Sequence, residues 1–430
     1  MWGEHLVRFL YSLLWYLLMP LIFLRLWIRG RKNPAYRLRW SERLAWFSGQ
    51  KPVQQETIWV HTVSVGETLA AVPLIRALII QYPQKSILVT STTPTGSERV
   101  KVAFADQVTH CYLPYDYPNS VKRFLNFYQP QLCLILETEL WPNFIYFCHQ
   151  RSIPVMVANA RLSQKSALGY QRFLKLSLPM LRQIEIIACQ TEIDKERFVA
   201  LGVNTDKIVV AGNIKYDLEI PSELIQQGKD LRKQIFPTQS KLWIAASTHH
   251  GEDEKLILIH QRILQKCPNA KLIIVPRHPE RFAEVLEICQ TSHLKIWQRS
   301  QGIPSEPEYD IFIGDSMGEL LLFYAMADCA FIGGSLVNRG GHNLLEAEAF
   351  ACPVVVGPYT YNFAEATRLM VDAGAAIQTD EGEMHFALIE WLNNSDACKE
   401  AGNIGKQIVI KNKGTLQKLL RSIEPLLSEK

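Results

Sequence analysis

The chain has 430 residues, which is too long for one ordinary hydrophobic core and indicates two domains. Apolar residues make up 48% of the sequence and charged residues 20%, a composition that excludes an intrinsically disordered chain. The formal net charge is only +4, and no nucleic-acid partner is expected.

The apolar N-terminal segment is followed by a strongly basic flank. Residues 9–24 carry no charge, and extension past Arg25 to Ile28 reaches the roughly 20 residues that a membrane span needs. From Arg25 to Arg43, seven basic residues face one acid, Glu42, so the local net charge is +6. These basic residues are Arg25, Arg29, Arg31, Lys32, Arg37, Arg39 and Arg43.

Residues 1–30 are therefore predicted to be a membrane anchor. The basic flank places the domains that follow it on the cytoplasmic face. No small-residue cleavage site follows the apolar run, which argues against a secretory signal peptide. The length favours a span, but a helix that lies in the interface stays open.

A strand, a tight turn and a helix follow one another between Thr57 and Leu78. Residues 57–61 read as a buried strand, Ser64 and Gly66 as the turn, and the helix opens near Glu67 with an apolar stripe of period 3.6. A carboxylate there would lie at the carboxyl edge of an open sheet, where ligands bind in doubly wound folds. The alternative is that Glu67 only complements the helix dipole.

Strands and helices alternate through residues 31–216, the predicted first domain. The candidate strands are short, apolar and β-branched, as in a parallel sheet covered on both faces. They are Ile58–His61, Ile87–Ser91, Leu132–Glu137, Val155–Asn159, Ile186–Gln190 and Ile208–Ala211. Helical patterns lie between them, for example at Pro118–Tyr128 and Glu192–Leu201.

Polar residues follow these strands, and the exits of a doubly wound sheet meet along one edge. This convergence makes Glu67 a site candidate. Glu137 and Glu139 lie at the end of an intensely apolar strand. Two acids there with no nearby base are costly unless they are solvated or have a function. Lys215 follows a Gly-Asn turn and reads as a site cation or a surface lysine. The loop 92–97 is suited to an anion, but an ordinary N-cap is favoured.

Residues 217–240 are polar, contain Pro221, Gly228 and Pro237, and are predicted to be a linker. A second βα series fills the predicted second domain, 241–430, whose last helix is left free to pack back on the first. Its strands are predicted at Leu242–Ala246, Leu272–Val275, Ile311–Ile313, Cys329–Ile332 and Pro353–Val356. Its helices are predicted at Asp253–Lys266, Arg281–Gln290, Met317–Met326, Gly341–Ala351 and Ala364–Ala373.

Loops of the second domain are typical of a phosphate site. Four glycines within residues 333–341 precede a predicted helix, so backbone N–H groups could approach a phosphate. The pattern matches neither G-x-G-x-x-G nor the P-loop. Arg277 would add a guanidinium fork, and Glu346 could accept hydrogen bonds from ribose hydroxyls. Four histidines (His249, His250, His278 and His342) lie on separate loops without metal-ligand spacing, and the nine scattered cysteines show no C-x-x-C pair, so no metal is predicted.

Seven motifs, taken together and in this order, resemble the Kdo transferases, which are glycosyltransferases of the GT-B fold that move 3-deoxy-D-manno-oct-2-ulosonic acid (Kdo) from CMP-Kdo to a lipid A precursor. The motifs are Trp59-Val60-His61 with Ser64 to Glu67, 92–96, 137–143, 159–161, 212–215, 276–281 and 340–343. The resemblance runs from the anchor to about residue 380. It implies an α/β fold of two Rossmann-like, doubly wound parallel-sheet domains facing a cleft, with an N-terminal membrane-anchor helix.

The resemblance also implies roles for single residues. Glu67 matches the general base, and Glu137 and Lys215 match positions that support the transition state. The residues that match CMP-binding segments are Pro276, Arg277, Met317, Gly318, Glu319, Asn343, Leu344, Leu345 and Glu346. One departure is Ala347, where the family pattern has proline after the glutamate.

The resulting expectation is an inverting, metal-independent transferase at the inner membrane. Its substrates would be CMP-Kdo, as donor rather than cofactor, and a lipid A precursor. One alternative is a GT-B transferase or epimerase that uses a different, UDP-linked sugar nucleotide. Another is a non-catalytic, membrane-attached nucleotide-binding module. The oligomeric state is not predicted.

Overall fold

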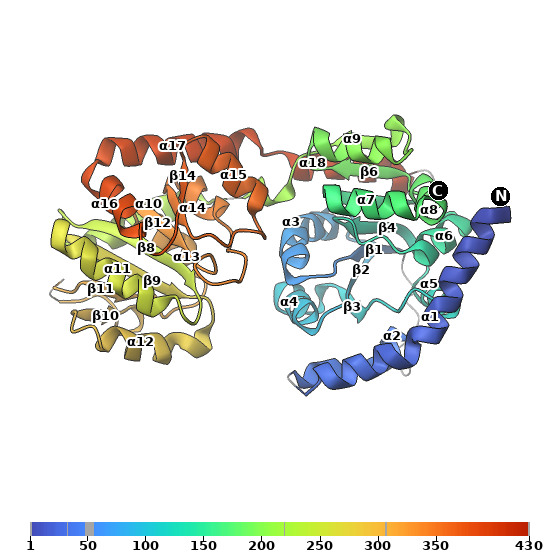
Figure 1. Ribbon diagram of the computed structural model, residues 1–430, viewed down its shortest axis with the longest axis horizontal. Helices are drawn as coiled ribbons and strands as arrows, with labels where there is room; N and C mark the ends of the chain where they lie inside the picture. Colours follow the sequence, from blue (N-terminus) through green and yellow to red (C-terminus); the bar gives the residue numbers. More distant parts are fainter. Residues whose placement is uncertain (1, 32, 48–55, 219, 306–307, 429–430) are drawn as a thin grey trace. The chain divides into compact units, whose positions relative to one another are not determined.

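The computed structural model describes residues 2–31, 33–47, 56–218, 220–305 and 308–428 (Figure 1). It divides the chain into two compact units. Unit 1 contains Met1–Asp217 and Lys413–Lys430, and unit 2 contains Leu218–Asn412.

Unit 1 is built on a seven-stranded parallel sheet of order β3-β2-β1-β4-β5-β6-β7. Its strands are β1 (Thr57–His61), β2 (Ser86–Ser91), β3 (Thr109–Tyr112), β4 (Pro130–Leu136), β5 (Val155–Ala160), β6 (Ile186–Cys189) and β7 (Ile208–Val210). The strand order reverses between β1 and β4, which are direct neighbours with His61 opposite Ile135. The residues after β1 and β4 therefore meet at the topological switch point of the sheet.

Helices cover both faces of this sheet. One face packs on α3, α4 and α18 through residues such as Leu74, Phe104 and Leu419. The other packs on α5, α6, α8 and α9 through residues such as Phe124 and Phe198. The helices of unit 1 are α1 (Trp2–Arg29), α2 (Trp40–Arg43), α3 (Val65–Gln81), α4 (Pro94–Phe104), α5 (Pro118–Tyr128), α6 (Pro142–Gln150), α7 (Gln164–Arg172), α8 (Leu174–Arg182), α9 (Glu192–Ala200) and α18 (Thr415–Ser428).

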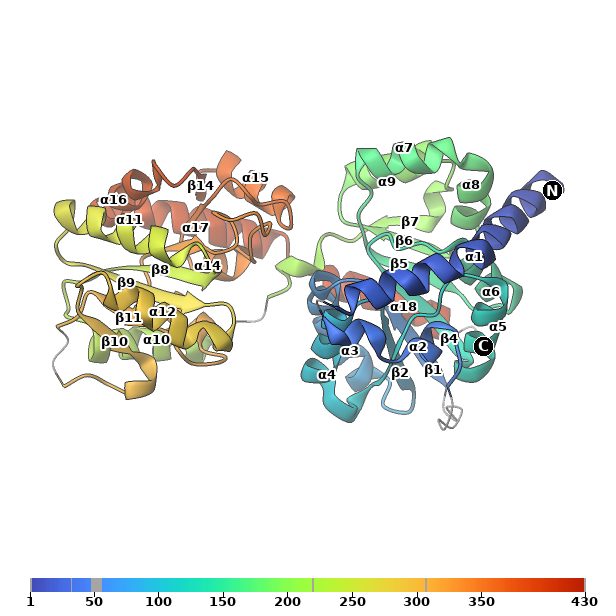
Figure 2. The ribbon, with the colours of Figure 1, turned by 60° about the horizontal axis from the view of Figure 1, so that its bottom comes forward.

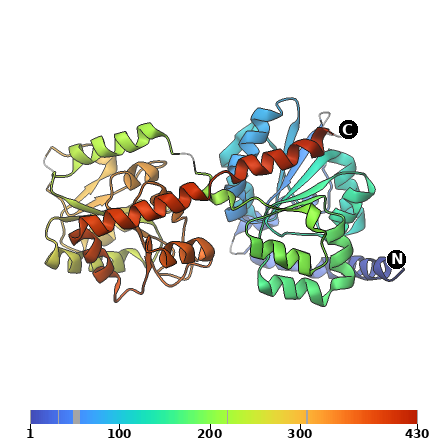
Figure 3. The same ribbon diagram turned by 90° about the horizontal axis from the view of Figure 1, so that it is seen from above.

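Helix α18 completes unit 1 from the far end of the chain (Figure 3). The Asp217 carboxylate accepts hydrogen bonds from the backbone N–H groups of Gly414 and Leu416, just where α18 begins. Leu419 and Ile423 are fully buried beside α3 and β4. Unit 1 is therefore made from two segments of sequence.

Unit 2 repeats the plan with a parallel sheet of order β10-β11-β9-β8-β12-β13-β14. Its strands are β8 (Lys241–Thr248), β9 (Ala270–Pro276), β10 (Ile296–Gln298), β11 (Ile311–Ile313), β12 (Cys329–Ile332), β13 (Val354–Val356) and β14 (Ala376–Gln378). Its helices are α10 (Ser222–Ile235), α11 (Asp253–Lys266), α12 (Phe282–Gln290), α13 (Leu320–Tyr324), α14 (Leu345–Ala349), α15 (Ala364–Asp372), α16 (Met384–Asn393) and α17 (Ser395–Lys411). The doubly wound α/β class is confirmed in both units.

The predicted linker 217–240 is wrong in most of its length, because its residues form α10 and pack on unit 2. Arg232 forms an ion pair with Asp328 at 2.7 Å and donates to the Met326 carbonyl. A Cβ built on Gly228 would lie 2.4 Å from that of Ala325, so the glycine permits close packing. Pro221 and Pro237, read as breakers, flank this helix.

Helix α17 makes a testable close contact through Gly402. A Cβ built there would lie 2.0 Å from the Ala351 carbonyl oxygen, which is backbone and cannot move aside easily. Gly402→Ala should destabilise unit 2 by about 1–3 kcal/mol through overpacking. Gly169→Ala in α7 meets nothing within 4 Å and should raise stability by up to about 1 kcal/mol. Thermal unfolding of both variants measures whether stability falls in Gly402→Ala and rises in Gly169→Ala. The same change in stability in the two variants would contradict the close contact at Gly402.

Candidate active site

The carboxylate of Glu67 closes the turn between β1 and α3. Ser64 is the N-cap of α3, and its hydroxyl oxygen accepts from the Glu67 N–H at 3.2 Å. In return, the Ser64 hydroxyl donates to Glu67 Oε1 at 2.9 Å, and the Val63 N–H donates to Oε2 at 2.7 Å. This reciprocal cap fixes the carboxylate at the edge of the sheet.

Glu67 is also electrostatically unusual. Burial, to 7% exposure, raises its pKa to about 7, and the charges of Glu137 and Glu139 act in the same direction. The hydrogen bonds from Val63 and Ser64 oppose the shift but do not cancel it. A carboxylate with a pKa near neutral pH is able to accept a proton in catalysis. Capping and base chemistry are thus compatible at this residue.

Glu137 and Lys215 lie together at the same sheet edge. Glu137 follows β4 with a left-handed backbone (φ 57°), and its N–H donates to the Ala158 carbonyl at 3.0 Å. Lys215 Nζ lies 3.9 Å from Glu137 Oε1. The edge therefore contains three neighbouring acids, Glu67, Glu137 and Glu139, together with a lysine.

Asn159 and Gln190 fix the turn that carries Lys215. The Asn159 side-chain oxygen accepts from the Ile214 N–H at 3.0 Å, and Gln190 donates to the Asn159 carbonyl at 3.0 Å. Asn213 donates to the Gln190 side chain at 3.1 Å. Asn159 belongs to the motif 159–161, whereas Gln190 was assigned no role from the sequence. Its signal was its position at the last residue of a predicted strand.

The loop 92–97 begins α4 as an ordinary capped helix. The Thr93 hydroxyl oxygen accepts from the Gly96 N–H at 3.1 Å. The hydroxyls of Thr92 and Thr93 also donate to the Val63 carbonyl, at 3.2 and 3.3 Å. The loop therefore braces the turn that binds Glu67.

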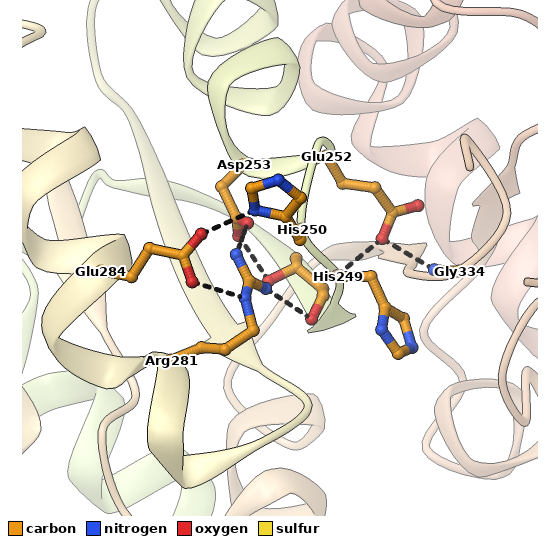
Figure 4. Close-up of polar contacts among 8 residues, drawn as sticks. His249, His250, Glu252, Asp253, Arg281, Glu284 and Gly334 are labelled. Carbon is orange, nitrogen blue, oxygen red and sulfur yellow. Dashed lines mark hydrogen bonds and ion pairs between the residues drawn. The ribbon is translucent and has the colours of Figure 1, made fainter. Parts of the chain in front are cut away.

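In unit 2, backbone N–H groups of the glycine-rich loop 333–341 are bound by a side chain of the protein itself. The fully buried Glu252 accepts from the N–H groups of His249 and Gly334 at 2.9 and 2.8 Å (Figure 4). It also accepts from the Leu336 N–H at 3.0 Å. These groups are thus not directed at a ligand, contrary to the expectation for residues 333–341. Helix α14 also begins at Leu345 rather than Gly341 and has only five residues.

Histidines and arginines gather beside this loop. The His249 and His342 Nε2 atoms are 2.7 Å apart, and the rings of His249 and His278 have centroids 5.6 Å apart. Burial lowers the pKa of His249 to about 4 and that of His342 to about 3, and the nearby Arg277 and His278 add to both shifts. Neutral imidazoles beside guanidinium groups favour an anion. Over the described residues, no cluster of three or more metal-ligating side chains is found.

Arg277 and Glu346 belong to the same neighbourhood. Arg277 follows β9, which ends at Pro276, and its N–H donates to the Thr248 carbonyl at 3.0 Å. Asn343 donates to Glu346 Oε1 at 3.1 Å. Burial raises the pKa of Glu346, whereas Asn343 and Arg277 act to lower it.

Leu344 and Leu345, which the resemblance also matched to CMP-binding segments, are fully buried. Their side chains anchor the turn that presents Asn343 and Glu346.

The segment Met317-Gly318-Glu319 is fixed by a residue that the sequence analysis did not identify. Arg299 binds the Glu319 carboxylate through two N–H groups, at 2.9 and 3.0 Å. Gly318 has φ 83°, a conformation that a helix does not continue, so α13 begins at Leu320 rather than at Met317. Met317 itself is 70% exposed.

Arg281 stabilises the 276–281 loop. It forms an ion pair with the buried Asp253, donates to the Thr248 carbonyl at 3.1 Å and binds Glu284 at 3.1 Å (Figure 4). His250 lies 2.8 Å from the same Glu284. These contacts account for Arg281 structurally.

Comparison with known proteins decides the family. A family model described as 3-deoxy-D-manno-octulosonic-acid transferase (kdotransferase) matches residues 38–218. The 3-deoxy-D-manno-octulosonic acid transferase of Haemophilus influenzae is 42% identical over 98% of this chain and 99% of its own length. This chain belongs to the Kdo transferase family.

The Kdo transferase of Bordetella pertussis is 34% identical over 85% of this chain and 86% of its own length. Among solved structures, Anabaena Alr3699/HepE in complex with UDP has a TM-score of 0.55 at 11% identity, covering 86% of this chain and 100% of its own. A putative UDP-N-acetylglucosamine 2-epimerase from Listeria monocytogenes has a TM-score of 0.54 at 13% identity, covering 88% and 98%. At such identities these structures confirm the GT-B fold alone, whereas the family makes this chain a glycosyltransferase.

The raised pKa of Glu67 predicts a pH-dependent stability. Below its ordinary pKa of 4.5 the acid is protonated in both states, so its shift carries no penalty there. Between pH 4.5 and about 7 the folded state holds the extra proton, and the free energy of unfolding falls as pH rises. At pH 8 the penalty reaches at most about 3 kcal/mol. Glu67→Gln should lose less stability than wild type between pH 5 and 8 in chemical unfolding, and an unchanged pH dependence would contradict the shift.

Proposed function

We propose that this chain is an inverting, metal-independent glycosyltransferase that moves Kdo from CMP-Kdo to a lipid A precursor, lipid IVA, in lipopolysaccharide core biosynthesis. The observation that carries the proposal is Glu67, a buried carboxylate at the switch point of the sheet with a pKa of about 7. The 42% identity to a Kdo transferase supports the donor and the sugar.

The chemistry in unit 1 is a direct displacement. The Glu67 carboxylate accepts the proton of the lipid hydroxyl while the oxygen of that hydroxyl forms a bond to the anomeric carbon of Kdo. The bond from that carbon to the phosphate oxygen of CMP breaks, and its electron pair leaves with CMP. Attack from the face opposite the leaving group inverts the anomeric centre. Lys215, with Glu137, supports the charge that develops on the sugar acid or phosphate.

Unit 2 supplies groups for the nucleotide. Arg277 presents a planar fork to the CMP phosphate, and Glu346 accepts from ribose hydroxyls. Glu319, held by Arg299, and Asn343 complete the proposed contacts. The fixed charge of the Arg277 guanidinium stabilises the departing phosphate, and no metal ion is included in the proposed site.

The acceptor is a lipid, and the proposed location is the cytoplasmic face of the inner membrane. Within the described residues, His5–Arg29 is the one helix apolar and long enough to cross a membrane, with a mean hydropathy of 1.8. The arginines after it support the cytoplasmic side, because the anionic lipids of the cytoplasmic leaflet attract basic residues beside the membrane. Lys32, part of the basic flank, lies outside the described residues.

Removal of the base should abolish transfer. Glu67→Gln, at a fixed pH of 8, should lower the rate of Kdo transfer to tetraacylated lipid A precursor by about 10²–10⁴-fold, because Gln cannot accept the proton. Glu67→Ala should be at least as slow. The measurement uses labelled Kdo, with CMP-Kdo generated in situ.

The control for this series is Glu192→Gln, a change of the same kind at a side chain 69% exposed on α9. It should transfer at the wild-type rate. Full activity in Glu67→Gln would remove this residue as the base and direct attention to Glu137. No transfer by a well-folded wild type would favour a UDP-linked donor.

Nucleotide choice is testable without turnover. CMP at about 100 times its Kd should stabilise the protein by about 2.7 kcal/mol against unfolding. Arg277→Ala should lose most of this protection because the phosphate loses its fork. Arg262→Ala, at an exposed arginine on α11, should keep it. Stronger protection by UDP than by CMP would favour the alternative donor.

A further inference from the structure

Helix α1 is docked on unit 1 by polar side chains. Tyr11 donates to Asp116 Oδ2 at 2.9 Å. Ser12, only 5% exposed, shares a hydrogen bond with the Asn143 side chain, 3.1 Å between Ser12 Oγ and Asn143 Nδ2. The Arg8 guanidinium lies 3.4 Å from the centre of the Tyr146 ring.

Aromatic contacts continue this docking toward the end of the helix. Trp15 stacks on Tyr115 with centroids 5.7 Å apart, and Phe23 packs on Trp40 at 5.1 Å. Leu26 is buried. The docked positions 8, 11, 12, 15, 23 and 26 recur with helical spacing, so they form one face of α1. Figure 2 shows α1 running lengthwise across unit 1.

The opposite face of α1 is an uninterrupted aliphatic surface. Seven residues spaced three or four apart form what we term the α1 stripe: Leu6, Leu10, Leu13, Leu17, Leu21, Leu24 and Ile28. Each is between 43% and 67% exposed. An exposed apolar surface of this length marks a site of interaction.

Docking and membrane spanning exclude one another. The docked contacts run from Arg8 to Leu26, about 27 Å along a helix and close to the roughly 30 Å of the hydrocarbon layer. A span surrounded by lipid would require α1 to leave the domain. Asp116 and Asn143, at most 1% exposed, would then lose the hydrogen bonds that Tyr11 and Ser12 make to them from α1.

The charges beside the stripe identify what covers it. Arg25, Arg29, Arg31 and Arg37 are all exposed. The acid of this segment, Glu42, is buried and bound to Arg39 at 2.6 Å. The exposed rim is therefore positive and complements anionic lipid headgroups. A second copy that paired through the same face would bring the same arginines and no complementary charge.

We propose that α1 lies in the plane of the membrane, with the α1 stripe in one leaflet, the docked face on unit 1 and both helix ends on the same side. The helix is then a monotopic platform that keeps unit 1 against the bilayer. This placement does not depend on which sugar the enzyme transfers.

Sidedness of the N-terminus tests the proposal. The nine native cysteines are buried, so a thiol placed at an exposed residue can be labelled selectively. His5→Cys and Glu400→Cys, the latter on α17, are labelled in the full-length protein with a membrane-impermeant maleimide in sealed inverted vesicles. Both should react before detergent is added. If Glu400→Cys reacts and His5→Cys needs detergent, α1 spans the membrane and the proposal fails.

Binding to vesicles tests the stripe itself. Leu17→Gln should weaken binding to phosphatidylcholine vesicles containing phosphatidylglycerol by about tenfold, because an amide replaces an exposed leucine that inserts into the leaflet on binding. The matched change Leu258→Gln, at an exposed leucine of unit 2, should leave binding unchanged. Unchanged vesicle binding by Leu17→Gln with loss of self-association would show that a second copy covers the stripe and would overturn the proposal.

Discussion

The carboxylate of Glu67 is bound twice by the residues directly before its own helix, and this contact determines both the shape and the charge of the sheet edge in unit 1. The Val63 N–H and the Ser64 hydroxyl hold it at 2.7 and 2.9 Å. Thr92 and Thr93 in turn bind the Val63 carbonyl, so the exits of β1 and β2 form one braced turn. The acid is fixed without a cation beside it, because no cation is among the causes of its pKa shift.

The same sheet edge holds a lysine near the acids without lowering the pKa of Glu67. Lys215 lies 3.9 Å from Glu137, and its turn is anchored to Asn159 by a backbone hydrogen bond. The lysine pairs with Glu137, while Glu67 keeps a pKa of about 7. In unit 2 a buried carboxylate also fixes a loop. Glu252 accepts hydrogen bonds from the Gly334 and Leu336 N–H groups and so fixes the shape of the loop 333–341.

The sequence predicted helices and strands best where hydrophobic periodicity and flanking turns agreed. Pro118–Tyr128 and Asp253–Lys266 form helices with the predicted bounds, and the predicted strands all occur in the parallel sheets. The missed strands β3, β10 and β14 are edge strands of the two sheets, are short and partly exposed, and so lack an apolar signature.

The sequence predicted which residues belong to the candidate site better than it predicted their contacts. Strand exits converge because parallel topology requires it, which is how Glu67, Glu137 and Lys215 were selected. The pairing of Arg299 with Glu319 joins residues 20 apart on separate loops, and no local pattern encodes it. The α10 helix was missed because its polar, proline-flanked sequence resembles a linker, and only its packing through Gly228 and Arg232 distinguishes it.

The role of Glu67 as the base is tested most directly by the pH dependence of the single-turnover rate of Kdo transfer, measured with enzyme in excess of CMP-Kdo and with saturating acceptor. If Glu67 is the base, the wild-type rate should rise about tenfold per pH unit below a pKa near 7 and level off above it. Glu67→Gln should be slow and lack this rise. A wild-type rate that is constant between pH 5 and 8, or the same rise retained in Glu67→Gln, would contradict the account.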